Sequence, residues 1–238
     1  DRKITEIFRH KLLRDRNNAL RKADQVTTIS PWHVEKLQAY NPNTELVYNG
    51  YDPELFYPEQ HRTSQFVITY TGRLISLATR DPRLLFEAVS RLDHEKLIDP
   101  DQFRIQWYVD AGSKAIIMQA ATAYPVARYM DFFDYVPASE IPGVLNRSSI
   151  LLQLANTFAS DGPKGFMTTK LFESMAVGKP LLCVKSDESC LEATIRNTRS
   201  GLAARTAEEA FRFILHHYQF WQDNGYTHIN TDKEAVER

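Results

Sequence analysis

The chain has 238 residues and a mass of 27.5 kDa, and 43% of its residues are hydrophobic, so it can bury a large core and wholesale disorder is excluded. Lysine and arginine number 29 against 30 aspartates and glutamates, and this net charge of -1 argues against nucleic-acid binding through bulk positive charge. Two cysteines and the absence of any apolar run of membrane-spanning length predict a soluble protein of the reducing cytoplasm.

The first part of the chain differs from the rest. Residues 1–24 predict a helix with apolar residues on one side and with more basic than acidic side chains. One interpretation is a helix that lies on an anionic membrane surface, which would place the protein peripherally at the inner membrane. The other is a solvated helix that packs on something else. Both interpretations stay open at this point.

After this helix, short apolar runs alternate with stretches of helical period, which is typical of a parallel sheet covered by helices. Strands are predicted at 25–30, 45–49, 66–71, 104–110, 130–135, 149–154 and 180–185, and helices at 82–93, 113–123, 139–146, 168–177, 187–197 and 206–222. Helix N-caps are expected at Ser113, Ser139 and Thr206, the last with Glu209 as a capping box. The predicted fold class is α/β: a Rossmann-like, doubly wound parallel sheet with helices on both faces.

The segment 41–58 contains three prolines and an Asn-Gly turn pair, so it is predicted to join two packed units. In a doubly wound sheet the ligand binds beyond the carboxyl ends of the strands. Functional residues are therefore expected in the loops that follow the predicted strands.

The loop after residue 71 contains Gly72 and Arg73, and Arg80 follows shortly before a predicted helix. Two guanidinium groups close to a helix N-terminus predict a site for a phosphate or pyrophosphate. Alternatively, Arg73 is paired with a carboxylate and Arg80 caps a turn.

A second loop, residues 162–167, leads into a predicted helix with Thr168, Thr169 and Lys170 in its first turn. Free backbone N–H groups, the helix dipole and the lysine predict an anion site. Glu173 lies one turn further along the same face, where a carboxylate could bind a ribose diol. The alternative is a surface ion pair between Lys170 and Glu173, worth well under about 1 kcal/mol.

Other signatures of chemistry are weak or missing in the sequence. It contains neither a Walker loop nor a Gly-x-Gly-x-x-Gly dinucleotide motif, and no Gly-x-Ser-x-Gly nucleophile elbow. Residues 99–101 read Asp-Pro-Asp but precede a strand, at the wrong end for a ligand site, and are predicted to form a turn. The histidines lack metal-ligand spacing. No metal site and no cofactor are predicted.

Four segments together resemble the C-terminal, donor-binding half of retaining GT-B glycosyltransferases of the family-four type, the glycosyl transferases group 1. In chain order they are Ala23-Asp24 through Ser30, Tyr48-Asn49-Gly50-Tyr51-Asp52 with Phe56 and Pro58, Tyr70-Thr71-Gly72-Arg73-Leu74, and Lys170-x-x-Glu173-x-x-Ala176-x-Gly178-Lys179-Pro180. The resemblance spans nearly the whole chain. It implies that residues 1–48 are a helix, the stub of an acceptor domain and a linker, and that residues 49–238 are a donor-binding domain.

The resemblance also implies roles for single residues. Arg73 and Lys170 would contact the donor pyrophosphate, backbone amides near Thr168 and Thr169 would touch the distal phosphate, and Glu173 would bind the ribose. The loop of Tyr135, Val136 and Pro137 would hold the base through main-chain atoms. The donor would be a UDP- or GDP-sugar, and the cationic groups would make a metal unnecessary.

Two departures from the family pattern leave alternatives open. Where many members carry an acidic residue that binds the donor sugar, this chain has Gly165, and the nearest upstream acid is Asp161. The chain is also expected to be an excised half that lacks the acceptor-binding domain and is inactive alone. The alternatives are a catalytically silent nucleotide-sugar-binding or interaction module and a GT-B-fold UDP-sugar epimerase. The catalytic residues, base, sugar, acceptor and oligomeric state are not predicted.

Overall fold

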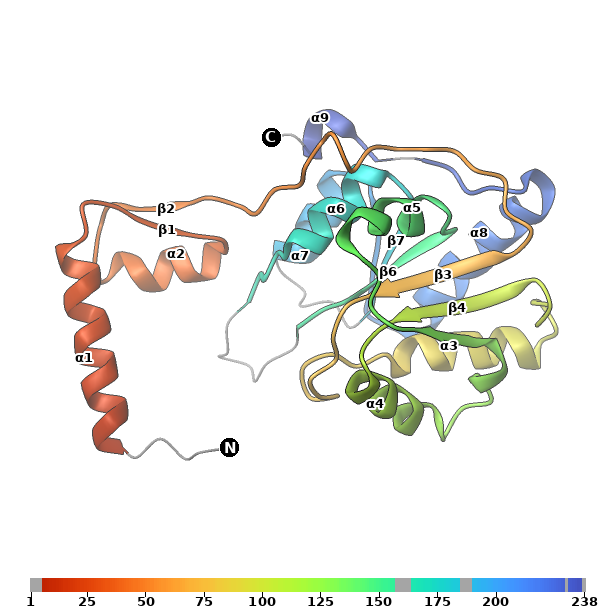
Figure 1. The fold of residues 1–238 in the computed structure, drawn as a ribbon, viewed down its shortest axis with the longest axis horizontal. Helices are drawn as coiled ribbons and strands as arrows, with labels where there is room; N and C mark the ends of the chain where they lie inside the picture. The colour runs from red at the N-terminus through yellow and green to blue at the C-terminus, as the bar shows by residue number, and fades with distance from the viewer. Residues whose placement is uncertain (1–5, 157–163, 185–189, 230, 237–238) are drawn as a thin grey trace.

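The computed structural model describes residues 6–156, 164–184, 190–229 and 231–236. In this part of the chain a six-stranded parallel sheet, with the strand order β5-β4-β3-β6-β7-β8, forms the main body (Figure 1). A separate two-stranded parallel sheet of β1 and β2 lies in the N-terminal part, which projects to one side. The predicted doubly wound α/β class is confirmed.

The main body begins after a long linker and uses every predicted strand from residue 66 onward. Its strands are β3 (Phe66–Thr71), β4 (Phe103–Tyr108), β5 (Met130–Phe133), β6 (Ile150–Leu154), β7 (Leu181–Val184) and β8 (Gly201–Ala204). Its helices are α3 (Arg83–His94), α4 (Ala111–Ala121), α5 (Ile141–Asn146), α6 (Thr169–Val177), α7 (Cys190–Asn197), α8 (Ala207–Asn224) and α9 (Lys233–Val236), with short 3-10 turns at Ala127–Tyr129 and Ala138–Glu140. The sequence analysis missed β8 because Gly-Leu-Ala-Ala is short and low in strand propensity.

Apolar side chains cover both faces of the sheet, as predicted for a buried parallel sheet. On one face, Ile105, Trp107 and other side chains pack against α3, α4 and α8. On the other face, Leu151 and Leu181 pack against α5, α6 and α7. Cys183 is fully buried in this second layer as a small core residue.

The predicted helix starts are right in one case and wrong in two. Thr206 forms the predicted capping box with Glu209 at the start of α8. The N-cap of α4 is Asp110 rather than Ser113, because the Asp110 carboxylate accepts the Ser113 N–H at 2.7 Å and the helix starts three residues earlier. Ser139 lies in a 3-10 turn, and α5 starts only at Ile141.

The N-terminal part consists of α1 (Glu6–Lys22), β1 (Val26–Thr28), α2 (Pro31–Gln38) and β2 (Thr44–Leu46). The first two predicted strands exist but pair only with each other, in parallel. The Asn41 amide donates to the carbonyls of Leu20 and Ala23, at 2.9 and 2.7 Å, and so ties the end of α1 to the turn before β2. The sequence analysis missed α2, which opens with Pro31 at its first position.

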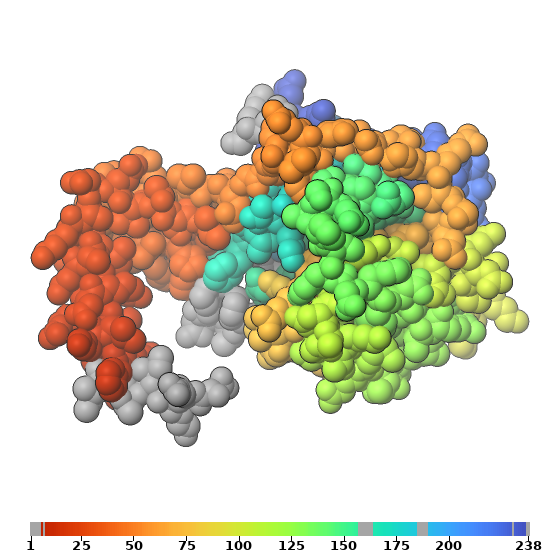
Figure 2. Space-filling model, viewed as in Figure 1, coloured from red at the N-terminus to blue at the C-terminus, as the bar shows by residue number. Residues whose placement is uncertain are grey.

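The predicted N-terminal helix is confirmed over α1, and several of its apolar side chains are exposed. Phe8 and Leu12 are 63% and 57% exposed, and the helix stands apart from the main body (Figures 1 and 2). This exposure suits both interpretations of the helix, so peripheral membrane binding stays a prediction. Among the described residues, no helix has the length and apolar character that crossing a membrane requires.

Two further expectations concern the turn at residues 99–101 and metal binding. The predicted turn at 99–101 is present, because the Asp99 carboxylate accepts the Asp101 N–H at 2.9 Å just before β4. Where the structure describes the chain, no group of three or more His, Cys, Asp or Glu residues could hold a metal ion.

Candidate functional site

A pocket opens where the direction of the sheet's strand order reverses. From β3 the chain proceeds outward through β4 and β5 and then returns to β6 on the other side of β3. Such a switch point leaves a crevice at the carboxyl ends of the two central strands. The pocket there has a volume of about 200 Å³, and its lining residues are Tyr70, Thr71, Arg80, Gln153, Leu154, Thr168, Thr169 and Lys170.

Lys170 of α6 reaches across this pocket to the glycine loop after β3. A Cβ at Gly72 would lie 3.0 Å from the Lys170 Nζ and 2.9 Å from the Tyr70 hydroxyl, so a side chain there would displace the ends of these two side chains. Burial lowers the pKa of the Lys170 ammonium, and the neighbouring positive charge of Arg80 lowers it further. The two predicted cationic loops therefore face each other across one pocket.

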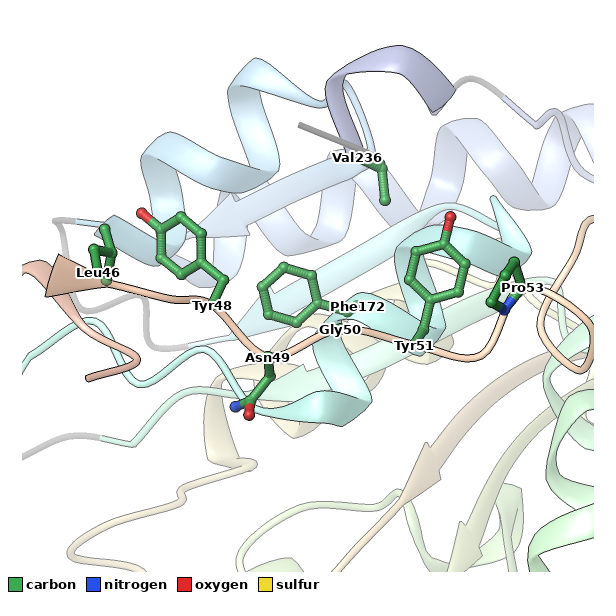
Figure 3. A pocket seen from close by; sticks show the side chains of 8 residues that line it. All are labelled: Leu46, Tyr48, Asn49, Gly50, Tyr51, Pro53, Phe172 and Val236. Carbon is green, nitrogen blue, oxygen red and sulfur yellow. The ribbon is translucent and has the colours of Figure 1, made fainter. Parts of the chain in front are cut away.

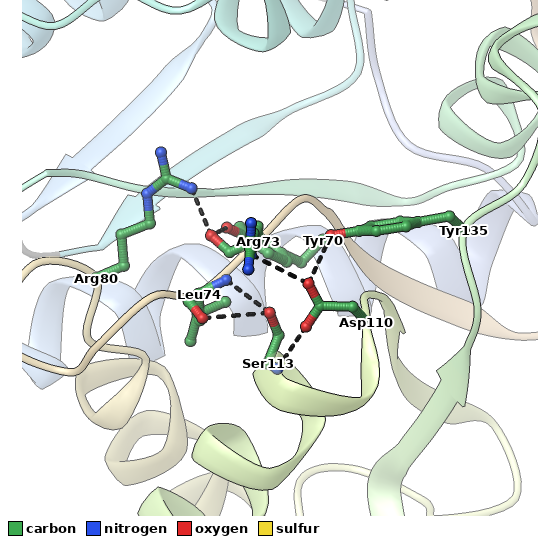
Figure 4. Close-up of polar contacts among 7 residues, drawn as sticks. All are labelled: Tyr70, Arg73, Leu74, Arg80, Asp110, Ser113 and Tyr135. Atoms are coloured by element: carbon green, nitrogen blue, oxygen red, sulfur yellow. Dashed lines mark hydrogen bonds and ion pairs between the residues drawn. The ribbon is translucent and has the colours of Figure 1, made fainter.

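Arg80 and Arg73 have different places in the site (Figure 4). Arg80 lines the pocket, where its Nε donates to the Asn156 side chain at 2.8 Å and its Nη1 to the Arg73 carbonyl at 2.5 Å. The Arg73 side chain is 71% exposed, and its Nε lies 3.2 Å from the Asp110 carboxylate. Pairing of Arg73 with a carboxylate, the alternative left open by the sequence, is thus what the structure contains.

The start of α6 supplies the backbone groups expected of an anion site. Thr168 is the N-cap residue, yet its side chain makes no capping hydrogen bond. The positive end of the helix dipole lies at the pocket, and the Thr168 side chain accepts no hydrogen bond from the backbone N–H groups there. Thr169 and Lys170 follow in the first turn, as the sequence predicted.

Glu173 lines a second hollow next to the pocket. This hollow has a volume of about 490 Å³ and shares Thr169 with the first pocket. Burial raises the pKa of the Glu173 carboxyl, and the nearby Lys170 ammonium opposes this shift. Ala138 and Ile141 also line this hollow.

The predicted base-contacting residues lie beside this hollow rather than on its lining. Tyr135 is 57% exposed, and its hydroxyl donates to the Asp110 carboxylate at 3.2 Å. Val136 follows Tyr135 in the same loop, and the lining continues from Ala138.

The segment predicted to be a junction borders the site from the other direction. Between residues 46 and 53 it also lines a third hollow of about 510 Å³, where Phe172 of α6 lies between Tyr48 and Tyr51 (Figure 3). The Asn49 side chain points away from this hollow, and its amide donates to the Met167 carbonyl at 2.8 Å. The predicted junction is therefore a wall of the site as well as a connection.

The loop before α6 is held by the N-terminal part. The Ser30 hydroxyl donates to the Lys164 carbonyl at 2.6 Å, and the ring of His33 lies 5.3 Å from that of Phe166, edge to face. Two segments that resemble acceptor-domain and linker motifs thus contact the loop that leads to Lys170.

Gly165, at the position where many members of the resembling family carry an acidic residue, is tightly packed and has a left-handed backbone. Its φ is +69°, and a Cβ would lie 3.0 Å from the Cys190 Cβ and 3.4 Å from the Ser30 hydroxyl. An acidic side chain at this position would require the loop and α7 to move. Asp161, the nearest acid in the sequence, lies outside the described residues.

Replacing Gly165 with alanine should therefore destabilise the protein. The left-handed conformation costs a non-glycine residue about 1–2 kcal/mol, and the contact with Cys190 adds to this cost. Urea denaturation should give a free energy of unfolding lower by about that amount. Gly50→Ala is the matched control, since a Cβ there meets no atom within 4 Å. Equal stabilities of the two variants would contradict this account of Gly165.

The structure brings together Arg80, Lys170, Thr168 and Thr169 in one pocket and Glu173 beside it, all from the predicted set. Sequence reasoning missed Asp110, Asn156 and Asn49. Asp110 is the last residue of one predicted strand and Asn156 lies two residues past the end of another, and these positions could have suggested both. No local pattern links Asn49 to the loop before α6.

No protein-family model matches the chain, and no curated protein is similar to it in sequence. Solved structures are similar in fold. HepE from Anabaena, solved in complex with UDP and glucose, is 18% identical with a TM-score of 0.67, and the match covers 99% of this chain and 65% of that one. Sucrose-phosphate synthase from Thermosynechococcus elongatus is 16% identical with a TM-score of 0.64, covering 96% of this chain and 57% of that one.

A third structure matches a single domain. The C-terminal domain of a glycosyl transferase group 1 family protein (LpcC) from Francisella tularensis is 16% identical with a TM-score of 0.51, and the match covers 78% of this chain and 96% of that domain. The chain thus has the fold of the C-terminal half of GT-B glycosyltransferases, and the predicted resemblance is confirmed in fold. The chain spans less than two thirds of the length of HepE.

Proposed function

We propose that this chain is the donor-binding part of a glycosyltransferase that takes a sugar from a nucleoside-diphosphate sugar. The observation that carries this proposal is the pocket at the switch point, where Lys170 and Arg80 meet the uncapped start of α6. A diphosphate suits this site because it carries negative charge and many acceptor oxygens. The UDP in the structurally similar HepE supports the same ligand class.

We assign the adjoining hollow to the nucleoside. Glu173 would accept hydrogen bonds from the ribose hydroxyls, and Ala138 and Ile141 would pack against the base. Tyr135 and Val136 would then hold the loop next to the base. Positive charge from Lys170, Arg80 and the helix dipole would stabilise the departing diphosphate, a task that many transferases give to a metal ion.

The transfer itself belongs to the whole protein in our proposal. The acceptor and the residues that activate it would be supplied by a further domain packed against the N-terminal part, and the family resemblance suggests retention at the anomeric carbon. The described chain would bind donor but transfer no sugar alone.

Calorimetric titration with UDP and GDP tests this proposal. We expect one of them to bind the chain at micromolar to millimolar concentrations, with heat absent for inorganic phosphate at the same concentration. No binding of either nucleotide at millimolar concentration would overturn the proposal.

A second candidate, a silent nucleotide-sugar-binding module, is favoured by one observation. Tight packing and a left-handed backbone at Gly165 disfavour the acid that binds the donor sugar in many family members. Under this alternative the intact protein binds a nucleotide sugar and never releases the nucleotide from it. Release of UDP or GDP from its sugar by the intact protein would exclude this alternative.

A further inference from the structure

We propose that Asp110 is a positioning residue for the diphosphate site: its carboxylate holds one edge of the Arg73 guanidinium and leaves the other edge free to bind an anion. This inference rests on the proposed function and adds to it a residue that none of the motifs contains.

The Asp110 carboxylate is itself fixed in place. It stands at the carboxyl end of β4 as the N-cap of α4, and its Oδ1 accepts the Ser113 N–H at 2.7 Å. The hydrogen bonds from Ser113, together with those from Tyr135 and the charge of Arg73, lower the pKa of this carboxyl. A rigid, ionised group is therefore available at the edge of the site.

Arg73 forms an ion pair with this carboxylate through Nε. The Nε lies 3.2 Å from Oδ2 of Asp110. A guanidinium carries four N–H donors on its two terminal nitrogens, and within the described parts of the chain those of Arg73 make no hydrogen bond. Two terminal nitrogens side by side match the oxygens of a phosphate.

The backbone of the Arg73 loop is anchored to the same turn of α4 (Figure 4). The Leu74 N–H donates to the Ser113 hydroxyl at 2.9 Å, and Arg80 donates to the Arg73 carbonyl. Main chain and side chain of residue 73 are thus both held by neighbours. The Tyr135 hydroxyl donates at 3.2 Å to Oδ2 of Asp110, the oxygen that also faces Arg73, and so links the loop after β5 to this network.

Two opposite effects follow from a carboxylate near a diphosphate site, and they allow a decisive test. If Asp110 acted only through its charge, removing the charge would strengthen UDP binding, since it repels the ligand. If Asp110 positions Arg73, removing its charge weakens UDP binding, because the long side chain must then be ordered when the ligand binds.

The test is a double-mutant cycle on UDP binding, measured by calorimetry, with Arg73→Gln, Asp110→Asn and the double variant. Asparagine remains a good N-cap, so α4 is retained. We expect Arg73→Gln to weaken UDP binding about 10-fold and Asp110→Asn about 5-fold. The double variant should bind no more weakly than Arg73→Gln alone, because Asp110 acts through Arg73.

Asp110→Ser provides a second variant that keeps a strong N-cap and cannot hold Arg73. Thr206→Ala is the matched control, since it removes the cap of α8 far along the chain: it should lower the melting temperature without changing UDP affinity. Unchanged or tighter UDP binding by both Asp110 variants, or effects that simply add in the double variant, would overturn the inference. If the unaltered chain fails to bind UDP and GDP, the proposed function and this inference both fall.

Discussion

Lys170→Met should reduce the affinity for the nucleotide that binds this chain, UDP or GDP, by about 100-fold, the largest single effect we expect at the site. The ammonium lies against Gly72 and is partly desolvated, so its attraction for a diphosphate is not fully screened by water. Methionine retains the unbranched stem and forms helices well, so α6 is preserved. Calorimetry of the variant and of the unaltered chain gives the ratio directly.

The pH dependence of nucleotide binding provides a second test of the Lys170 charge. Because burial and Arg80 lower its pKa, Lys170 loses its proton at a lower pH than an ordinary lysine does. Nucleotide affinity should therefore begin to fall as the pH rises into the alkaline range, and Lys170→Met should remove this dependence. Lys36→Met, on an exposed side chain of α2, is the matched control and should leave affinity unchanged. A Lys170→Met variant that binds like the unaltered chain would place the diphosphate elsewhere.

His217→Phe should remove about 3 kcal/mol of acid-induced destabilisation between pH 6.5 and 4. His217 is buried in α8, with only 7% of its surface exposed. Burial lowers its pKa from 6.5 to about 4, with smaller contributions from the charges of His216 and His228. The unfolded chain therefore binds a proton at pH values where the folded chain does not.

The sign of the effect follows from this difference. A folded-state pKa below the unfolded value contributes stability above pH 6.5, and this contribution is lost as the pH falls toward 4. Phenylalanine fills similar space beside Phe213, whose ring centroid lies 4.5 Å from that of His217, and does not titrate. Urea denaturation at pH 7, 5.5 and 4 should show a smaller loss of stability for His217→Phe than for the unaltered chain. His10→Phe, on exposed α1, should show no such difference, and equal losses in all three proteins would refute a neutral buried imidazole.

The pattern of apolar residues determined the class of fold. Runs such as Leu181-Leu182-Cys183-Val184 require cover on both faces, which a parallel sheet with flanking helices provides. The spacing of Lys170 and Glu173 placed both on one helix face, since three residues make about one turn. These features depend on residues close in the chain, so a linear pattern is enough to predict them.

Tertiary packing decided which of the candidate residues meet. Arg80 lines the pocket, whereas Arg73 pairs with Asp110. This pairing joins two loops whose residues are 37 positions apart in the chain. Asn49 and Ser30 bind the loop before α6 across more than 100 residues of chain. Loops have no periodicity from which such neighbours could be inferred, and their positions follow only once the strands are ordered in the sheet. The separation of β1 and β2 from the main sheet could not be predicted either. Strand pairing joins residues that are far apart in the chain, and an apolar run does not specify its partner strand.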